Sequence, residues 1–176
     1  MANREALREL QGRLADRLQE VKTQERVKGW LAVEAGGHAF LLPLAEAGEI
    51  FQPTSLLAVP HARPWFLGVA NLRGVLAGVV DLAGYLGLRA RPPLGEREQA
   101  RVVAFNPSLD INVALQVDRL AGLRNAGQMT LEAHADAVQP AFVGPRYRDG
   151  QGRAWQELEL ALLARDERFL HIVGVT

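Results

Sequence analysis

The N-terminal segment carries apolar residues at helical spacing. Leu7, Leu10, Leu14, Leu18 and Val21 recur every three or four positions, which places them on one face of an α-helix. Charged residues occupy most of the other positions, so the pattern predicts an amphipathic helix over residues 3–22. A stripe this narrow needs a surface to pack against. Either the helix packs on its own domain or the stripe binds another chain, and the pattern leaves both interpretations open.

From residue 29 onward the apolar residues form short runs. Residues 30–35 and 38–44 predict a hairpin around Gly36-Gly37, because glycine accepts the positive φ angles of a two-residue turn. Many short runs divided by turn residues are typical of an all-β barrel or sandwich. The further predicted strands are residues 56–59, 66–70, 75–80, 101–105, 111–117 and 120–123.

The remaining segments complete the predicted order. Residues 81–88 predict one helical turn, residues 155–164 a helix, and residues 169–175 a last strand. Residues 89–99 contain two adjacent prolines and several charges, which is typical of an exposed connector between two lobes. We therefore divide the chain into an N-terminal helix, residues 1–28, and a β-rich domain, residues 29–176.

Composition excludes several classes of protein. The 176 residues contain no cysteine, which excludes disulfides and thiolate metal sites and suits a reducing compartment. The formal net charge is zero, without the basic excess of a nucleic-acid-binding protein. The most apolar stretch, residues 65–80, is interrupted by Asn71 and Arg73, and the N-terminus has no apolar signal region. We expect a cytoplasmic protein that neither binds nucleic acid nor inserts into a membrane.

The sequence carries no pattern typical of catalysis or cofactor binding. The four histidines, His38, His61, His134 and His171, lack the spacing of a metal site on a helix. The phosphate-binding loop, the dinucleotide fingerprint and the nucleophile elbow are also missing. We therefore predict no catalytic residue, no cofactor and no metal, and favour an interaction module over an enzyme.

Residues 59–87 carry an ordered set of motifs that resembles the core signature of CheW-like domains. The motifs follow one another without a gap, and weaker similarity extends over residues 30–176. They are Val59-Pro60, Gly68-Val69-Ala70-Asn71-Leu72-Arg73-Gly74, Val79-Val80-Asp81-Leu82 and Leu86-Gly87.

The resemblance implies a fold and a function. The fold is mainly β, with two packed five-stranded SH3-like barrels, here joined by the N-terminal helix and a short C-terminal helix. The function is that of a non-enzymatic adaptor in two-component signal transduction. Its partners are a methyl-accepting chemoreceptor and the regulatory domain of a CheA-like histidine kinase. The long N-terminal helix and the ending Arg168-Phe169-Leu170-His171-Ile172 look like the PilI branch, which serves type IV pili and twitching motility. Chemotaxis and twitching motility are both left open as the output.

The same resemblance implies partner-binding residues, namely Glu49, Asn71, Leu72, Arg73 and Gly74. An asparagine such as Asn71 can hydrogen-bond the backbone of a tight turn, and Gly74 permits positive φ. Arg73, inside an apolar stretch, either pairs internally with Asp81 or contacts a carboxylate of a partner, while Asp81 itself is expected to cap the short helix that follows. Glu49 is either a solvated edge residue or a receptor-facing charge.

One departure and one alternative function complete the expectations. The family commonly has proline where this chain has Gly78, so the edge of the first barrel is expected to differ locally. The alternative is a stand-alone β-barrel that binds a small molecule in a pocket lined by Trp65, Phe66 and Trp155.

Overall fold

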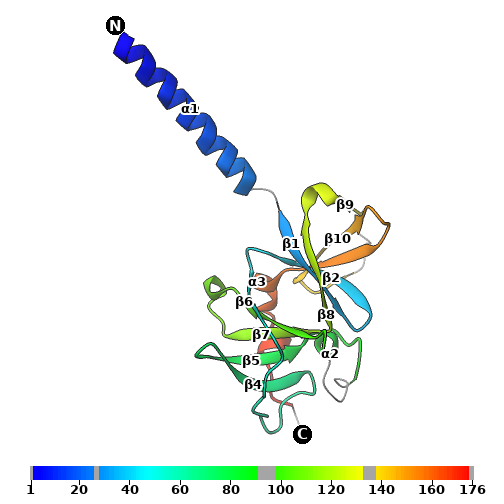
Figure 1. Cartoon of the computed structure of the whole chain (residues 1–176). Coiled ribbons are helices and arrows are strands. Elements are labelled where there is room, and N and C mark those ends of the chain that lie inside the picture. Colours follow the sequence, from blue (N-terminus) through cyan, green and yellow to red (C-terminus); the bar gives the residue numbers. More distant parts are fainter. Residues whose placement is uncertain (1, 26–27, 91–97, 133–137, 175–176) are drawn as a thin grey trace.

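The computed structural model describes residues 2–25, 28–90, 98–132 and 138–174 (Figure 1). It consists of a long N-terminal helix, eleven strands and three short α-helices. The helices are α1 (Ala2–Glu25), α2 (Leu82–Tyr85), α3 (Leu160–Leu163) and α4 (Glu167–Leu170). The strands are β1 (Gly29–Ala35), β2 (His38–Pro43), β3 (Ala47–Phe51), β4 (Phe66–Leu72), β5 (Val75–Asp81), β6 (Arg101–Phe105), β7 (Val113–Val117), β8 (Arg119–Asn125), β9 (Met129–Leu131), β10 (Val143–Asp149) and β11 (Ala154–Leu158).

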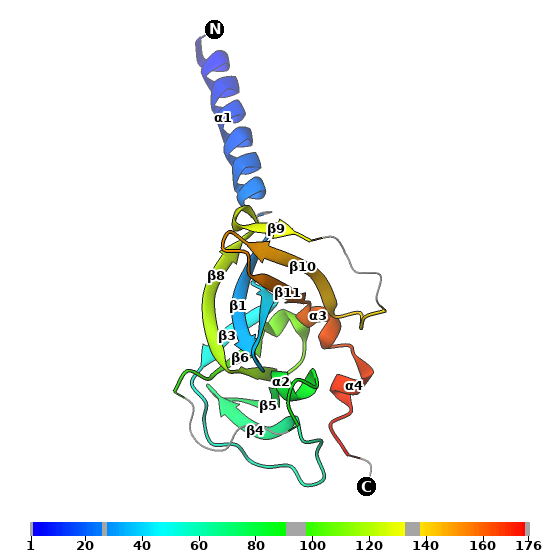
Figure 2. The same cartoon turned by 90° about the vertical axis from the view of Figure 1, so that its right-hand side faces the viewer.

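The strands form two packed sheets, which confirms the predicted fold class. One sheet has five strands in the order β3-β6-β7-β5-β4, and the other has six in the order β8-β1-β2-β11-β10-β9, one more than expected. Most neighbours are antiparallel, but β2–β11 and β5–β7 are parallel pairs. Figure 2 shows the short helices α2, α3 and α4 on one side, along the junction of the two sheets.

The two sheets are interleaved along the chain. All strands of the five-stranded sheet lie between β2 and β8, so the six-stranded sheet collects its strands from both sides of that block. The predicted connector, residues 89–99, instead lies between α2 and β6, and the strands flanking it belong to the same sheet. Within it, residues 91–97 lie outside the described residues.

Buried side chains form one shared core and one small core inside each sheet. The shared core contains Leu31, Val33, Val80 and Leu115, which come from both sheets. Alternate residues of the same strands face the other way: Trp30 and Ala32 join the core of the six-stranded sheet, and Ala77 and Val79 that of the five-stranded sheet. This alternation follows from the two-residue period of a strand. It gives each sheet its own interior, as in a small barrel.

Several predicted elements are confirmed and several are wrong. The β1–β2 hairpin turns at Gly36 and Gly37, whose φ angles are 57° and 78°. The predicted helix over residues 155–164 is wrong in its first half, because residues 154–158 pair with β2 and β10. The last predicted strand is the short helix α4 followed by a single bridge at Val173, and residues 56–59 make only a bridge at Leu57. Strands β3, β9 and β10 were not expected.

The N-terminal helix projects away from both sheets (Figure 1). The described stripe leucines, Leu7, Leu10, Leu14 and Leu18, are 54–62% exposed. The interpretation that this stripe packs on its own domain is therefore wrong for these leucines. Among the described residues, no helix combines the length and apolarity needed to cross a membrane.

Glu34 links the edge of the six-stranded sheet to a turn and gives a testable pH dependence. Its carboxylate accepts hydrogen bonds from Arg119 at 2.7 and 2.8 Å and from Arg153 at 2.6 Å. The hydrogen bonds from Arg119, followed by the hydrogen bond from Arg153 and the charges of both arginines, lower the pKa of Glu34 from 4.5 to about 2, against the opposing effect of burial. A carboxyl whose pKa falls on folding stabilises the protein above its unfolded pKa, and this contribution is lost as the pH falls through the folded value.

We expect Glu34→Gln to lower the free energy of unfolding by about 1–2 kcal/mol near pH 7, since both arginines are partly solvated. The difference from the wild type should shrink between pH 5 and pH 2, and urea unfolding at several pH values measures it. A difference that stays constant over this range would contradict the assignment.

Candidate functional site: the hairpin groove

The hairpin between β4 and β5 presents the residues singled out in the sequence. Leu72 pairs with Val75, so Arg73 and Gly74 form a two-residue turn. Their φ angles are 51° and 84°, as a type I′ turn requires. The Gly74 backbone N–H donates to the Asn71 side-chain oxygen at 2.6 Å. Asn71 and Gly74 therefore shape the turn, as the sequence indicated.

Arg73 lies in a backbone conformation that non-glycine residues seldom adopt. The left-handed region costs an L-residue about 1–2 kcal/mol, and type I′ turns favour asparagine, aspartate or glycine at this position. The side chain of Arg73 is 77% exposed and forms an ion pair with Glu49 of β3 at 2.8 Å. The expected internal pairing of Arg73 with Asp81 is wrong, because Asp81 pairs with Arg89. An exposed ion pair of this kind is worth at most about 1 kcal/mol, so it does not outweigh the strain.

A groove of about 280 Å³ opens beside this ion pair, and we call it the hairpin groove. Its walls come from β3, from the β4–β5 hairpin, and from the β6–β7 connection. Leu72 forms part of the wall and is buried, so it supports the groove rather than projecting from it. The lining residues are Glu49, Phe51, Leu72, Arg73, Val75, Ala77, Ala104, Phe105, Pro107, Ile111, Asn112 and Val113.

One of the apolar lining residues is itself exposed. Val75 is 48% exposed and lines the groove together with Glu49 and Arg73. Ile50 and Leu76 are 40% and 67% exposed, but each directly follows a groove-lining residue along its strand and therefore faces the other side of the sheet. The hairpin groove therefore combines a largely apolar lining with the Glu49–Arg73 ion pair, which is a common composition for a protein-binding surface. The sequence did not reveal this groove, although the two-residue spacing of Val75 and Ala77 along β5 could have indicated that they face the same side.

Comparison with known proteins assigns the chain to a family. The CheW-like domain matches residues 29–168. The chain belongs to the CheW-like family. Protein PilI of Pseudomonas aeruginosa is 30% identical over 155 residues, which cover 85% of this chain and 83% of that protein. Chemotaxis protein CheW of Rhizobium meliloti is 35% identical over 63 residues, or 36% of this chain and 41% of that protein.

A solved structure agrees on the fold. The scaffolding protein TtCheW of Thermoanaerobacter tengcongensis superposes with a TM-score of 0.61 and 17% identity, covering 75% of this chain and 88% of that one. At this identity the comparison shows a shared fold. The matched CheW-like region begins at β1, so α1 lies outside it.

Asp81, a residue of the CheW-like signature, belongs to a hydrogen-bond network that links the two sheets. Its carboxylate is fully buried and accepts two hydrogen bonds from Arg89, one of them at 3.0 Å. Arg89 also donates to Asp118 at 2.9 and 3.1 Å, and Asp118 accepts from the backbone N–H of Gly36 at 2.9 Å. The expected capping role of Asp81 is wrong. It precedes α2 but makes no capping hydrogen bond, because Arg89 occupies its carboxylate.

The structure explains why glycine occupies two positions in the signature region. A Cβ on Gly68, which has a φ of 137°, would lie 2.5 Å from the backbone oxygen of Leu57. A Cβ on Gly78 would lie 2.9 Å from the ring of Phe66, and the Gly78 N–H donates to Asn112 at 3.0 Å. A proline at position 78 would lose this bond. Gly78 lies on β5, between β4 and β7, so the expectation of an altered sheet edge is wrong.

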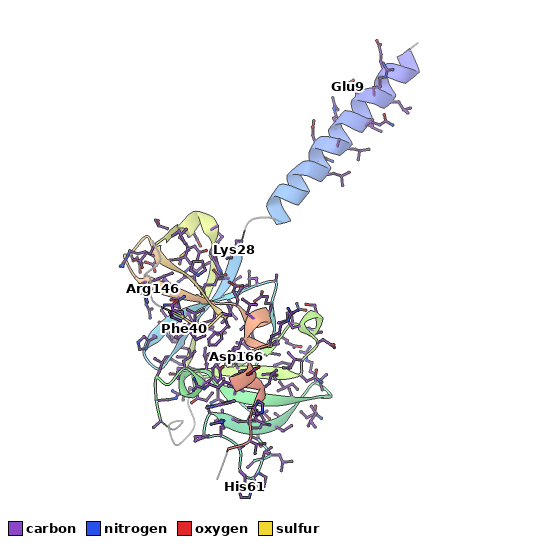
Figure 3. All side chains as sticks on the ribbon, turned by 180° about the vertical axis from the view of Figure 1, so that it is seen from behind. Glu9, Lys28, Phe40, His61, Arg146 and Asp166 are labelled. Carbon is purple, nitrogen blue, oxygen red and sulfur yellow. The ribbon has the colours of Figure 1, made fainter. Side chains whose placement is uncertain are left out.

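The structure does not support the alternative ligand pocket. Trp65 and Trp155 are buried in different cores, and neither they nor Phe66 line the grooves of the CheW-like domain described here. A second groove, of about 380 Å³, lies between β2, the end of α2, β10 and β11. Phe40 and Arg146, both labelled in Figure 3, contribute to its wall. Within the described part of the chain, no cluster of His, Cys, Asp or Glu residues is suited to hold a metal ion.

Proposed function

We propose that this chain is a non-enzymatic adaptor that couples a chemoreceptor to the regulatory domain of a CheA-like histidine kinase. Family membership supports the adaptor class, since the relatives include a chemotaxis protein and a scaffolding protein. The similarity to Protein PilI over most of both chains favours a system that controls type IV pili. The site of coupling in this proposal is the hairpin groove, with Glu49 and Arg73 as its charged contacts.

The observation that carries the proposal is the strained position of Arg73. A residue held in an unfavourable backbone conformation, when its own ion pair is exposed and weak, is more consistent with selection for binding than for stability. The guanidinium can make paired hydrogen bonds to a carboxylate of a partner. The apolar residues that line the groove with it, among them Phe51, Val75 and Ile111, supply the surface that such a contact would bury.

Calorimetric titration of the purified protein with the regulatory domain of its host's CheA-like kinases tests the coupling. We expect specific binding to one of them without nucleotide, weakened about tenfold or more by Arg73→Ala if the arginine is a central contact. Arg148→Ala is the matched control. Arg148 forms a comparable half-exposed ion pair with Glu132, but on the other sheet.

The same variants should be titrated with the isolated signalling tip of the chemoreceptor. Loss of binding to one partner only would assign the hairpin groove to that partner. Equal binding of both partners by the wild type and by Arg73→Ala would contradict the proposed site, and failure to bind any kinase or receptor would contradict the function itself.

Arg73→Asn separates binding from stability at the same position. Asparagine is favoured in a type I′ turn, so the relief of strain should offset the lost ion pair, and the free energy of unfolding should stay constant or rise by up to about 1 kcal/mol. Partner binding should fall as in Arg73→Ala. Thermal denaturation measures the stability and calorimetry measures the partner binding. A variant less stable than the wild type would show that Arg73 stabilises the fold.

A further inference from the structure

The N-terminal helix presents an unpaired apolar stripe far from the hairpin groove. The leucine stripe consists of Leu7, Leu10, Leu14 and Leu18, all more than half exposed. Figure 3 shows the helix extending away from the sheets, with Glu9 labelled on its outer half and Lys28 near its base. Exposing four leucines on one face of a helix to water is unfavourable in free energy unless another surface covers them.

The helix itself depends on a partner for stability. Gly12 lies in its middle with open space around it, and a glycine there weakens a helix by about 1 kcal/mol relative to alanine. An isolated helix of this kind is marginal in water, since most helical stability comes from packing of an apolar face. Coverage of the leucine stripe would supply that packing.

The charges around the leucine stripe identify the kind of partner. At about 100° per residue the four leucines span an arc of only about 80°. Arg13 and Arg17 lie beside one edge of this arc, whereas Arg8 lies about 80° beyond the other edge, toward Glu5 on the opposite face of the helix. The Arg13–Glu9 ion pair, at 3.1 Å, ties one flanking arginine to the polar back of the helix. The surface next to the stripe is thus basic along the edge that carries Arg13 and Arg17.

Two other occupants fit this surface less well. An antiparallel second copy of α1 would place Arg13 and Arg17 beside the same arginines, and like charges at these flanking positions disfavour pairing. A parallel copy would place them beside the edge that carries Gln11 and Ala15, which offers no carboxylate. A membrane surface needs a broad apolar face, usually with aromatic residues, but the stripe is narrow and α1 contains no aromatic residue. A narrow stripe is instead the width of a helix-to-helix seam.

We infer that α1 is a docking helix for an acidic amphipathic helix of another protein, whose apolar stripe is flanked by aspartates or glutamates. The leucines would pack against the partner's apolar residues, and Arg13 and Arg17 would pair with its carboxylates. This contact is separate from the hairpin groove, so it would give the adaptor a second, independent point of attachment.

Two synthetic helical peptides provide the probe. Both carry the same leucine stripe, one flanked by glutamates and the other by lysines, and each is titrated with the full-length protein by fluorescence anisotropy. We expect the glutamate peptide to bind about tenfold or more tightly than the lysine peptide, with an affinity that falls as salt is raised.

Matched variants assign the contact to the proposed residues. Leu10→Gln/Leu14→Gln and Arg13→Gln/Arg17→Gln should each weaken binding of the glutamate peptide about tenfold. Glutamine is a good helix former, and circular dichroism checks that the helix is retained. Glu5→Gln/Asp16→Gln, on the opposite face, and Arg73→Ala, in the hairpin groove, should leave peptide binding unchanged.

Three results would overturn the inference. Equal affinity for the two peptides, or binding of neither, would remove the acidic helix as the partner. A dimer seen by sedimentation and lost in Leu10→Gln/Leu14→Gln would identify a second copy as the occupant. Leucine-dependent binding to phosphatidylglycerol vesicles would identify a membrane surface. Peptide binding that persists when every kinase and receptor titration fails would leave α1 as a docking helix and reject only the proposed function.

Discussion

Replacement of Arg89 by methionine should lower the free energy of unfolding by about 3–5 kcal/mol, the cost of leaving a buried charge without its partner. Asp81 is fully buried and takes two hydrogen bonds from Arg89, whose side chain is only 15% exposed. Methionine would keep much of the side-chain volume but remove every side-chain hydrogen-bond donor that Arg89 offers to Asp81 and Asp118. Chemical denaturation in urea measures the loss.

Two further variants separate charge from packing at this position. Asp81→Asn in the Arg89→Met background should recover part of the lost stability, because the neutral amide costs less to bury than an unpaired carboxylate. Arg148→Met, which breaks the half-exposed pair with Glu132, should cost less than about 1 kcal/mol. Similar losses in Arg89→Met and Arg148→Met would show that the buried network contributes no more than a surface ion pair.

Gly68→Ala should cost about 3 kcal/mol or more, because it combines an unfavourable backbone angle with an atomic overlap. The overlap is with the backbone oxygen of Leu57, 2.5 Å from the new Cβ, and a backbone atom cannot turn aside as a side chain can. Leu57 and Val69 also exchange two hydrogen bonds, at 2.8 and 2.9 Å, which hold the two segments in place. Thermal or urea denaturation measures the loss of stability.

Gly150→Ala is the matched control for Gly68→Ala. Gly150 has open space where a Cβ would be and lacks a positive φ, so its replacement should change the free energy of unfolding by less than about 0.5 kcal/mol. If Gly68→Ala were equally harmless, the close approach of the Leu57 segment to β4 would be incorrect.

The sequence predicted those parts of the fold whose signals are local. Gly36 and Gly37 specify their turn by accepting positive φ, and Asn71 and Gly74 specify theirs through a side-chain hydrogen bond and a positive φ, so both hairpins were expected where they occur. The family signature supplied the two-sheet fold, which periodicity alone could not distinguish from other all-β folds. It also supplied Glu49 and Arg73, and the structure brings these two residues into contact.

The parts that were missed depend on contacts between distant segments. Residues 155–158 read as helix because leucine, glutamine and glutamate favour helices, yet they pair with Phe40 and Leu41 across the chain, and that pairing decides the outcome. The pairing of Asp81 with Arg89 rather than Arg73 was likewise not visible, since the turn at Arg73 points its side chain toward β3. The hairpin groove forms only when three separate segments meet, namely β3, the β4–β5 hairpin and the β6–β7 connection.

The interleaved order of the two sheets sets the order in which the chain can fold as it leaves the ribosome. Every strand of the five-stranded sheet is available once residue 117 has been made, so that sheet can form early. The six-stranded sheet must wait for residues 154–158, which join Phe40 and Leu41 across more than a hundred intervening residues. Such long-range closure is slow. The β1–β2 hairpin therefore stays open to non-native pairing through most of synthesis, and we expect it to be the region that most needs chaperone protection.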